Sequence, residues 1–398
     1  MMPLLTNHDA KRLFLHTHGL AQDPSLAADL GTTIRQIGFV QLDSINTLAR
    51  AHDMILWSRQ RSYLPHMLKD LLEQDRSLFE HWTHDASVIP MEFFPHWRHR
   101  FTDHQARLDA KKNGVIQTGF AASCAEVIDH ITRHGPAMTR HLGRDEVRGS
   151  GGWWDWSPSK AALEGLWRSG TLSIAGRDGF QKIYDLTHRV IPDTLRSLAP
   201  ARHESEDWAN EKALDHLGFA TPAQIAAFWA MVPVARVRKW AELGLGSGAL
   251  IMVQIAAFDG SLHLHLMRPK TYKTVAKLPD PVKITRLLSP FDPILRDRAR
   301  ALKLFGFNYR IEVFVPKENR IYGYYVFPIL KGDALIGRID AKADRQKKQL
   351  NVRAFWPEQS VKPIPKLVKS LEVALQDCAA FAGLDQIVFA QDWLRSAP

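Results

Sequence analysis

The clearest pattern lies between Ser123 and Arg189, where apolar positions change from helical spacing to strand-like alternation. Helical spacing predicts a first helix that ends at Gly135-Pro136, and residues 137–142 suit a short second helix. A third helix is predicted between Ser157, a favoured N-cap, and Gly170, a favoured helix terminator. The apolar positions that mark the first and third helices are Val127, Ile128, Ile131, Leu163, Leu166 and Trp167.

A predicted β-hairpin follows the third helix directly, which completes the order of a winged helix-turn-helix. Its strands are residues 171–175 and 181–186, joined by a Gly-Arg-Asp-Gly turn that supplies positive φ angles. The same order recurs downstream, so the chain is interpreted as a modular array. This repeat comprises helices at 211–217, from Thr221-Pro222 onward and at 234–243, then strands at 249–257 and 262–267 around Asp259-Gly260.

The two ends of the chain complete the predicted fold, which is α+β: three tandem winged helix-turn-helix modules followed by an antiparallel, strand-rich C-terminal region. Near the N-terminus we expect helices at residues 8–18 and 25–37, then an extended stretch from Phe39 to Trp57. The C-terminal strands are expected at 310–315, 322–330, 334–340 and 350–355, before a final helix at 364–382. The expected boundaries are 1–120 for the first module, 121–200 for the second, 201–283 for the third and 284–398 for the C-terminal region.

Composition indicates a globular protein that attracts polyanions. The 398 residues are 45% hydrophobic, which suffices for several cores, and the net charge is +10 with a pI near 9.6. Only two cysteines occur, Cys124 and Cys378, without the spacing of a zinc site or a disulfide framework, so a reducing compartment is expected. Because the sequence shows neither a signal peptide nor a long apolar run, we expect a cytoplasmic protein without a membrane partner.

Three winged helices on a basic chain favour DNA binding, since such modules place their third helix in a groove and the wing on the backbone. Two alternatives stay open at this point. Many winged helices serve only as protein scaffolds, and a non-enzymatic transcriptional regulator has the same pattern and charge.

Several segments resemble one family of enzymes over nearly the whole chain. These are GFVQLDSINTLARAHDMILWSR from Gly38, FEHWTHDASVIP from Phe79, LSPFDPILRDRARALKLFGFNYRIEVFVP from Leu288 and RIYGYYVFPILKGDALIGRIDAKADR from Arg320. They are similar to the bacterial winged-helix DNA glycosylases that unhook interstrand crosslinks, the AlkZ and YcaQ family. The resemblance implies DNA glycosylase activity on double-stranded DNA with alkylated or crosslinked purines. It also implies no cofactor or metal, and a monomer is expected because tandem modules already give one chain an extended surface.

The family carries its catalytic residues in a motif of glutamine, an aliphatic residue, then glutamine or aspartate, and here the motif reads Gln41-Leu42-Asp43. The aspartate form resembles the YcaQ-like branch, to which broader substrates, N7-alkylated purines and mustard-type crosslinks, are attributed. If residues 39–45 form a strand, Gln41 and Asp43 lie on one face, about 6–7 Å apart. An ionised Asp43 then stabilises the oxocarbenium-like sugar and directs water, while Gln41 hydrogen-bonds the water or the sugar. The alternative is a strand end at which Asp43 caps a nearby amide.

Four other features are candidate DNA contacts or structural groups. Trp82 and His84 lie in a family-like segment and are taken as site neighbours, whereas a zinc site or metal-dependent nuclease built on the histidines between His81 and His99 lacks convincing spacing. The cluster Arg296, Arg298 and Arg300 contacts phosphates or forms a salt-bridged helix face. Lys342 and Arg345, with Lys347 and Lys348, suit a basic hairpin loop. Trp153, Trp154 and Trp156 are expected to pack in the core of the second module.

Overall fold

The computed structural model describes residues 2–27, 29–112, 118–142, 157–359, 361 and 365–396, with side chains omitted for 110–112 and 118. The chain forms two compact units. Unit 1 comprises Met1–Leu64, Asn210–Phe228 and Val232–Pro398, and unit 2 comprises Pro65–Ala209 and Trp229–Met231. Helices and mainly antiparallel sheets build both units, as the α+β prediction requires. The four-module boundaries at 120, 200 and 283 stay a prediction.

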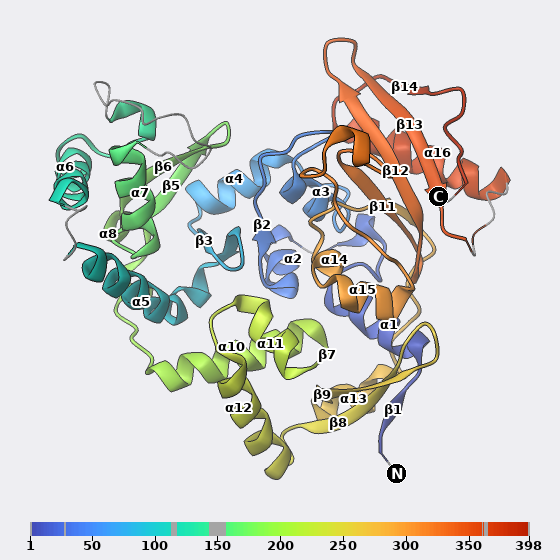
Figure 1. The fold of residues 1–398 in the computed structure, drawn as a ribbon, viewed down its shortest axis with the longest axis horizontal. Helices are drawn as coiled ribbons and strands as arrows, with labels where there is room; N and C mark the ends of the chain where they lie inside the picture. Colours follow the sequence, from blue (N-terminus) through green and yellow to red (C-terminus); the bar gives the residue numbers. More distant parts are fainter. Residues whose placement is uncertain are drawn as a thin grey trace. The chain divides into compact units, whose positions relative to one another are not determined.

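The N-terminal part of unit 1 is largely helical (Figure 1). Thr6 caps the first helix because its hydroxyl accepts a hydrogen bond from the backbone N–H of Asp9 at 3.1 Å. The extended stretch predicted from Phe39 to Trp57 is wrong, since only two residues form a strand and a helix follows. The elements are β1 (Leu4–Leu5), α1 (Asn7–Thr17), η1 (Pro24–Leu26), α2 (Leu30–Ile37), β2 (Val40–Gln41) and α3 (Ala51–Trp57).

A four-stranded sheet with the order β1-β8-β9-β7 joins the start of the chain to its middle. The predicted hairpin around Asp259-Gly260 is confirmed, as is the helix that opens at Thr221-Pro222. In that helix Thr221 and Gln224 each accept a hydrogen bond from the other's backbone N–H. The elements are α10 (Arg202–Leu217), which begins in unit 2, then β7 (Phe219–Ala220), α11 (Pro222–Trp229), α12 (Val234–Gly246), β8 (Ile251–Ala256), β9 (Leu262–Met267) and α13 (Pro269–Val275).

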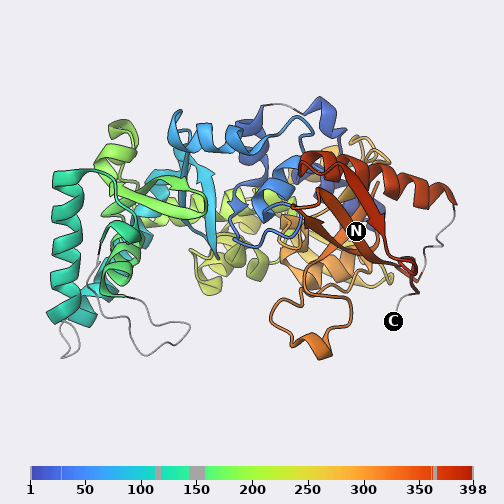
Figure 2. The same ribbon diagram turned by 90° about the horizontal axis from the view of Figure 1, so that it is seen from above.

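The C-terminal sheet has the order β10-β11-β12-β13-β14, with antiparallel neighbours except for the parallel pair β13-β14. Strands were predicted near β11, β12 and β13, and the final helix is confirmed as α16. The strand predicted at 310–315 is wrong, because those residues belong to a loop that Figure 2 shows in orange. The elements are β10 (Thr285–Leu287), α14 (Pro293–Arg296), α15 (Arg298–Phe305), η4 (Lys317–Asn319), β11 (Val326–Lys331), β12 (Ala334–Asp344), β13 (Gln349–Pro357), α16 (Pro365–Phe381) and β14 (Gln386–Phe389).

Unit 2 contains the winged pattern that the sequence shows most clearly. Ser157 caps α7 by accepting from the backbone N–H of Lys160, and Gly170 follows that helix at φ 76°. Two details differ: the short second helix is the 3-10 turn η3, and the first wing strand continues to Asp178 instead of turning at Gly176. The elements are α4 (Pro65–Glu73), β3 (Leu78–Trp82), β4 (Ala86–Pro90), η2 (Met91–Phe93), α5 (Phe94–Lys112), α6 (Thr118–His134), η3 (Thr139–His141), α7 (Pro158–Arg168), β5 (Leu172–Asp178), β6 (Gln181–Leu186), α8 (Thr187–Val190) and α9 (Asp193–Arg196).

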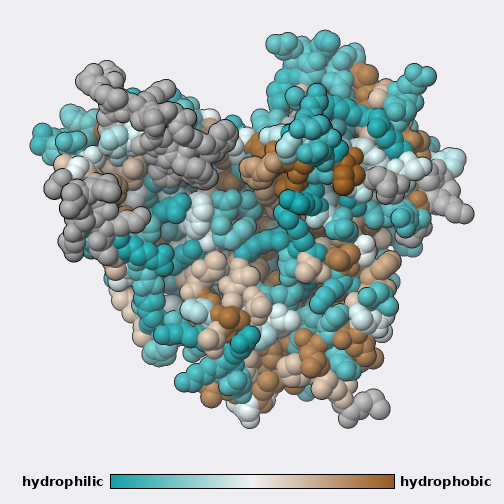
Figure 3. Space-filling view, viewed as in Figure 1, coloured by the Kyte–Doolittle hydropathy of each residue, from teal (hydrophilic) through white to brown (hydrophobic). Residues whose placement is uncertain are grey.

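Each unit has its own apolar core. In unit 2, Ile131 of α6, Leu163 and Trp167 of α7 and Tyr184 of β6 pack together, which confirms the predicted helix faces. Both cysteines are buried and neither is in a disulfide, as expected of small core residues. Trp153, Trp154 and Trp156 lie outside the described residues. On the face in Figure 3, apolar colour is interspersed with hydrophilic colour in the region of β8, β9 and α13. The β8–β9 hairpin exposes Phe258, Leu262 and Leu264.

Candidate active site

The Gln41-Leu42-Asp43 motif lies where the chain leaves strand β2. Helix α2 ends at Gly38, whose φ of 88° favours glycine, and β2 ends at Gln41. Gln41 is buried, whereas Asp43 is partly exposed. The prediction of a strand to Ile45 is therefore wrong. The Asp43 carboxylate accepts a hydrogen bond from the Ile45 backbone N–H at 2.7 Å, the amide-capping contact that the alternative interpretation predicts.

The basic hairpin between β12 and β13 is bound to the residues that follow this motif. Arg345 donates to the Asn46 side-chain oxygen at 2.6 Å and to the Leu48 carbonyl at 3.0 Å. The backbone N–H of Ala343 donates to the Thr47 carbonyl at 2.9 Å. Lys342, immediately before Ala343, is exposed. The structure thus brings two predicted site residues, Lys342 and Arg345, to the segment that Asp43 begins.

Tyr325 is a site neighbour that sequence reasoning missed. Its side chain is buried, which raises its pKa, and the Asp43 carboxylate raises the pKa further. The phenol therefore stays protonated at physiological pH and lies within the electrostatic field of Asp43. The only sequence signal for this tyrosine is its place in the family-like segment RIYGYYVFP.

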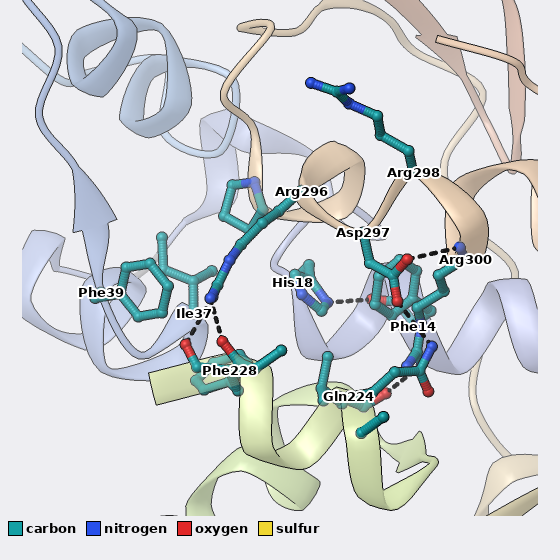
Figure 4. A pocket seen from close by; sticks show the side chains of 14 residues that line it. Phe14, His18, Ile37, Phe39, Gln224, Phe228, Arg296, Asp297, Arg298 and Arg300 are labelled. Carbon is teal, nitrogen blue, oxygen red and sulfur yellow. Dashed lines mark hydrogen bonds between the residues drawn. The ribbon is translucent and has the colours of Figure 1, made fainter. Parts of the chain in front are cut away.

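The arginines of α14 and α15 do not form one phosphate-binding cluster (Figure 4). Arg296 donates to the carbonyls of Ala227 and Phe228, and Arg300 donates to the Leu217 carbonyl at 2.9 Å. Burial lowers the pKa of Arg296 to about 10 and that of Arg300 to about 9. Arg298 alone is exposed, and in Figure 4 it points away from the other two. The predicted cluster therefore splits into two internal groups and one surface group.

A cavity of 470 Å³ lies between these internal arginines and the N-terminal helices. Phe39, two residues before Gln41, lines it together with Phe14 and Phe228 (Figure 4). The Arg300 guanidinium lies 4.3 Å from the Phe14 ring and 4.3 Å from the Phe219 ring. The Phe39 ring lies 5.4 Å from the Phe228 ring and 5.2 Å from the Arg296 guanidinium, so the segment that leads into β2 packs against α11 and α14.

Trp82 and His84 belong to unit 2. The Trp82 ring is half-buried beneath the guanidinium of Arg168 at 4.2 Å, and His84 hydrogen-bonds the Thr83 hydroxyl at 3.0 Å. A polar cavity of 270 Å³ beside Trp82 is also lined by Arg100, Arg107 and Arg168, a basic group that the sequence pattern did not reveal. The arrangement offers positive charge beside one aromatic face.

His81, His96 and His99 serve structural roles. His81 packs on the Trp167 ring, and burial lowers its pKa to about 3. His96 stacks on Trp208, and His99 hydrogen-bonds the Pro200 carbonyl at 3.0 Å. Within the described ranges of the chain, no three His, Cys, Asp or Glu side chains are grouped as metal ligands.

Comparisons with known proteins bear on the fold and on the family of this chain. Among the helices described, none has the length and apolar character that crossing a membrane requires. The solved structure of the Streptomyces sahachiroi DNA glycosylase AlkZ is similar in fold, with a TM-score of 0.62 and 16% sequence identity. That match covers 97% of this chain and 100% of the AlkZ chain. A model of the family described as DNA glycosylase AlkZ-like matches residues 34–381, so the chain belongs to the AlkZ-like DNA glycosylase family and is a DNA glycosylase enzyme.

Proposed function

We propose that this DNA glycosylase hydrolyses the N-glycosidic bond of N7-alkylated purines, including purines joined in an interstrand crosslink. Gln41 and Asp43 are the proposed catalytic pair. The observation that carries the proposal is the place of the motif: Asp43 is partly exposed at the end of β2, and the next residues bind the basic β12–β13 hairpin through Arg345. A carboxylate beside a positively charged hairpin suits a reaction on the sugar of a polyanion.

In the proposed mechanism the alkylated purine leaves first. The bond between C1′ and N9 breaks, its electron pair goes to the cationic base, and the base departs neutral, so no strong general acid is required. The ionised Asp43 carboxylate stabilises the oxocarbenium-like sugar and accepts a proton from the water that attacks C1′. The Ile45 backbone N–H, at 2.7 Å from one carboxylate oxygen, fixes the orientation of Asp43. Gln41 hydrogen-bonds the water or the sugar, and the product is an abasic site.

Three tandem winged-helix modules form the proposed DNA-binding scaffold, with boundaries at residues 120, 200 and 283. A crosslinked base is tied to both strands and does not enter a tight extrusion pocket, so the enzyme requires an open site. The proposed DNA contacts are Lys342, Arg345 and the exposed Arg298, with Trp82 and His84 of unit 2. Arg296 and Arg300 take a structural role, because their guanidinium groups are held inside unit 1. We further propose a cytoplasmic monomer without cofactor.

A base-release assay tests this function. Purified protein is incubated with duplexes that carry 7-methylguanine, 3-methyladenine or a mustard crosslink, and released bases and hot-alkali breaks are measured. We expect release of 7-methylguanine and unhooking of the crosslink, with Asp43→Asn and Gln41→Ala each lowering the rate by about 10²–10³-fold. Asp392→Asn, at an exposed carboxylate remote in sequence, is the matched control and keeps wild-type rates. Absence of release from every substrate would overturn the proposal.

A further inference from the structure

The loop of residues 310–324 is anchored at both of its ends. Figure 2 shows this loop in orange, standing clear of the β-sheet with η4 at its far end. At its base the Tyr309 hydroxyl donates to the Val326 carbonyl at 2.7 Å, and Arg338 donates to the Asn308 carbonyl at 3.0 Å. The Arg338 guanidinium also lies 4.3 Å from the Tyr322 ring. The loop therefore starts and ends at points that are fixed to β11 and β12.

The interior of the loop is also hydrogen-bonded. The buried Glu312 carboxylate accepts the backbone N–H groups of Ile321, Tyr322 and Gly323 at 3.1, 3.0 and 2.9 Å. Arg320 donates to the Val315 carbonyl at 2.9 Å across the loop. Three bonds to one carboxylate hold the two arms together, and charge-assisted bonds of this kind are stronger than neutral ones. The loop is thus an ordered projection.

This ordered loop presents a bare aromatic ring. Phe314 is 93% exposed and Ile321 is 64% exposed, although apolar side chains of this size gain free energy when they leave water. A scaffold that holds such a ring in solvent is suited to a partner that buries it. The exposed charges of the loop are Arg310, Lys317 and Glu318, and Arg320 adds a further cation. With the buried Glu312 included, three cations and two carboxylates give the loop a net charge of +1, a sign that suits a polyanion.

We propose that Phe314 is a wedge that inserts between stacked base pairs of duplex DNA next to the nucleotide being cleaved. Proteins that bend DNA insert apolar side chains between base steps in this way and partly unstack them. The loop leads into β11, whose Val326 pairs with Asp340 of β12. Further along β12, the Ala343 backbone N–H donates to the Thr47 carbonyl four residues after Asp43, so the wedge and the catalytic motif share one region of unit 1. Unstacking loosens the damaged nucleotide without extruding it. This inference rests on the proposed function and adds a DNA contact next to the damaged nucleotide.

Fluorescence of 2-aminopurine reports the unstacking directly. Duplexes carry this base at successive steps beside the lesion, and Asp43→Asn protein binds them without cleavage. We expect an increase in fluorescence at one step, which is lost when Phe314→Ala is added and kept with Phe314→Trp. Loss of the ring should weaken duplex affinity about 5- to 150-fold, the range for stacking of one aromatic side chain on a base. Leu26→Ala, at another apolar side chain that is 79% exposed in unit 1, is the control and changes neither readout.

The outcomes separate the two proposals. Because Phe314 is 93% exposed, its replacement should leave the urea midpoint unchanged, so a loss of signal reports on DNA and not on folding. If Phe314→Ala changes neither the fluorescence nor the affinity, the wedge is overturned even when the wild-type protein releases bases. The exposed ring is then assigned to a protein partner instead. A signal that depends on Phe314 in a protein that releases no base supports the wedge and overturns only the proposed function.

Discussion

The buried ion pair between Arg59 and Asp292 joins the end of α3 to the segment before α14. Arg59 Nη1 and Nη2 lie 2.8 and 3.0 Å from the two Asp292 oxygens, and the side chains are 1% and 0% exposed. Arg59 also donates to the carbonyls of His18 and Ile55 at 2.7 and 2.9 Å. One Asp292 oxygen accepts the Ile294 backbone N–H at 3.2 Å, which caps α14. Every strong contact of this guanidinium is therefore inside unit 1.

Replacing Asp292 with asparagine leaves the Arg59 charge buried without its counter-ion. Because the partner of a buried pair cannot be replaced by water, we expect Asp292→Asn to lower the free energy of unfolding by about 3–5 kcal/mol. The free energy of unfolding of a typical domain is only about 5–15 kcal/mol in total. The free energy of unfolding is measured by urea titration followed by circular dichroism. The slope of this free energy against urea concentration is expected to equal that of the wild type.

The matched control is Asp385→Asn, also in unit 1. Asp385 forms an ion pair with Lys348 at 3.5 Å, and the two side chains are 67% and 64% exposed. Solvent screens this pair, so its loss should change the free energy of unfolding by less than about 1 kcal/mol. If Asp292→Asn destabilises the protein no more than Asp385→Asn does, the reasoning from burial is refuted.

Three further predictions concern other parts of the chain. Burial lowers the pKa of His81 to about 3, against 6.5 in the unfolded chain, so the unfolded state binds the proton first as pH falls. The contribution of the neutral ring to the free energy of unfolding is therefore fully present above pH 6.5 and decreases by about 1.4 kcal/mol per pH unit below it. Urea titrations at several pH values should show this pH dependence reduced in His81→Gln. Arg345→Ala should weaken DNA binding and reduce the slope of log affinity against log salt by about 1, and an unchanged slope contradicts a phosphate contact. Gly170→Ala should destabilise unit 2 by about 1–3 kcal/mol more than Gly179→Ala, as measured by thermal unfolding. Both glycines have a positive φ, but only a Cβ added at Gly170 would clash with the Phe101 ring, at 2.6 Å.

Sequence reasoning succeeded where local signals and packing agree. The third helix of the unit 2 module begins at Ser157, as predicted, because a serine cap and an apolar stripe indicate the same boundary. It failed at residues 310–315, where polar and apolar side chains alternate from Arg310 to Val313 as in a strand, but the Glu312 carboxylate is buried and accepts three backbone N–H groups of the same loop. It failed again at α3, whose N-cap Arg50 makes no side-chain capping bond and gives no boundary signal.

The candidate site was predictable only as a motif. Gln41 and Asp43 stand out in a family-like segment, but Arg345 reaches Asn46 from 299 positions away. The effect of the Asp43 carboxylate on the pKa of Tyr325 likewise involves two residues that are far apart in the sequence. No periodicity in the sequence encodes such pairs, because they depend on how the C-terminal sheet packs on the N-terminal helices. Arg296 and Arg300 show the same limit, since their carbonyl acceptors on α10 and α11 are set by tertiary packing.

The pairing of β1 with β8 has a consequence during translation. Leu4 is aligned with Gln254, so β1 leaves the ribosome about 250 residues before its partner strand is synthesised. At 5–20 residues per second this delay is roughly 12–50 s. Residues 65–209 of unit 2 are synthesised within that interval, so most of unit 2 emerges and can begin to fold while the N-terminal segment of unit 1 is still unpaired. A nascent chain stalled near residue 230 should therefore resist protease across most of unit 2 and remain sensitive near its N-terminus.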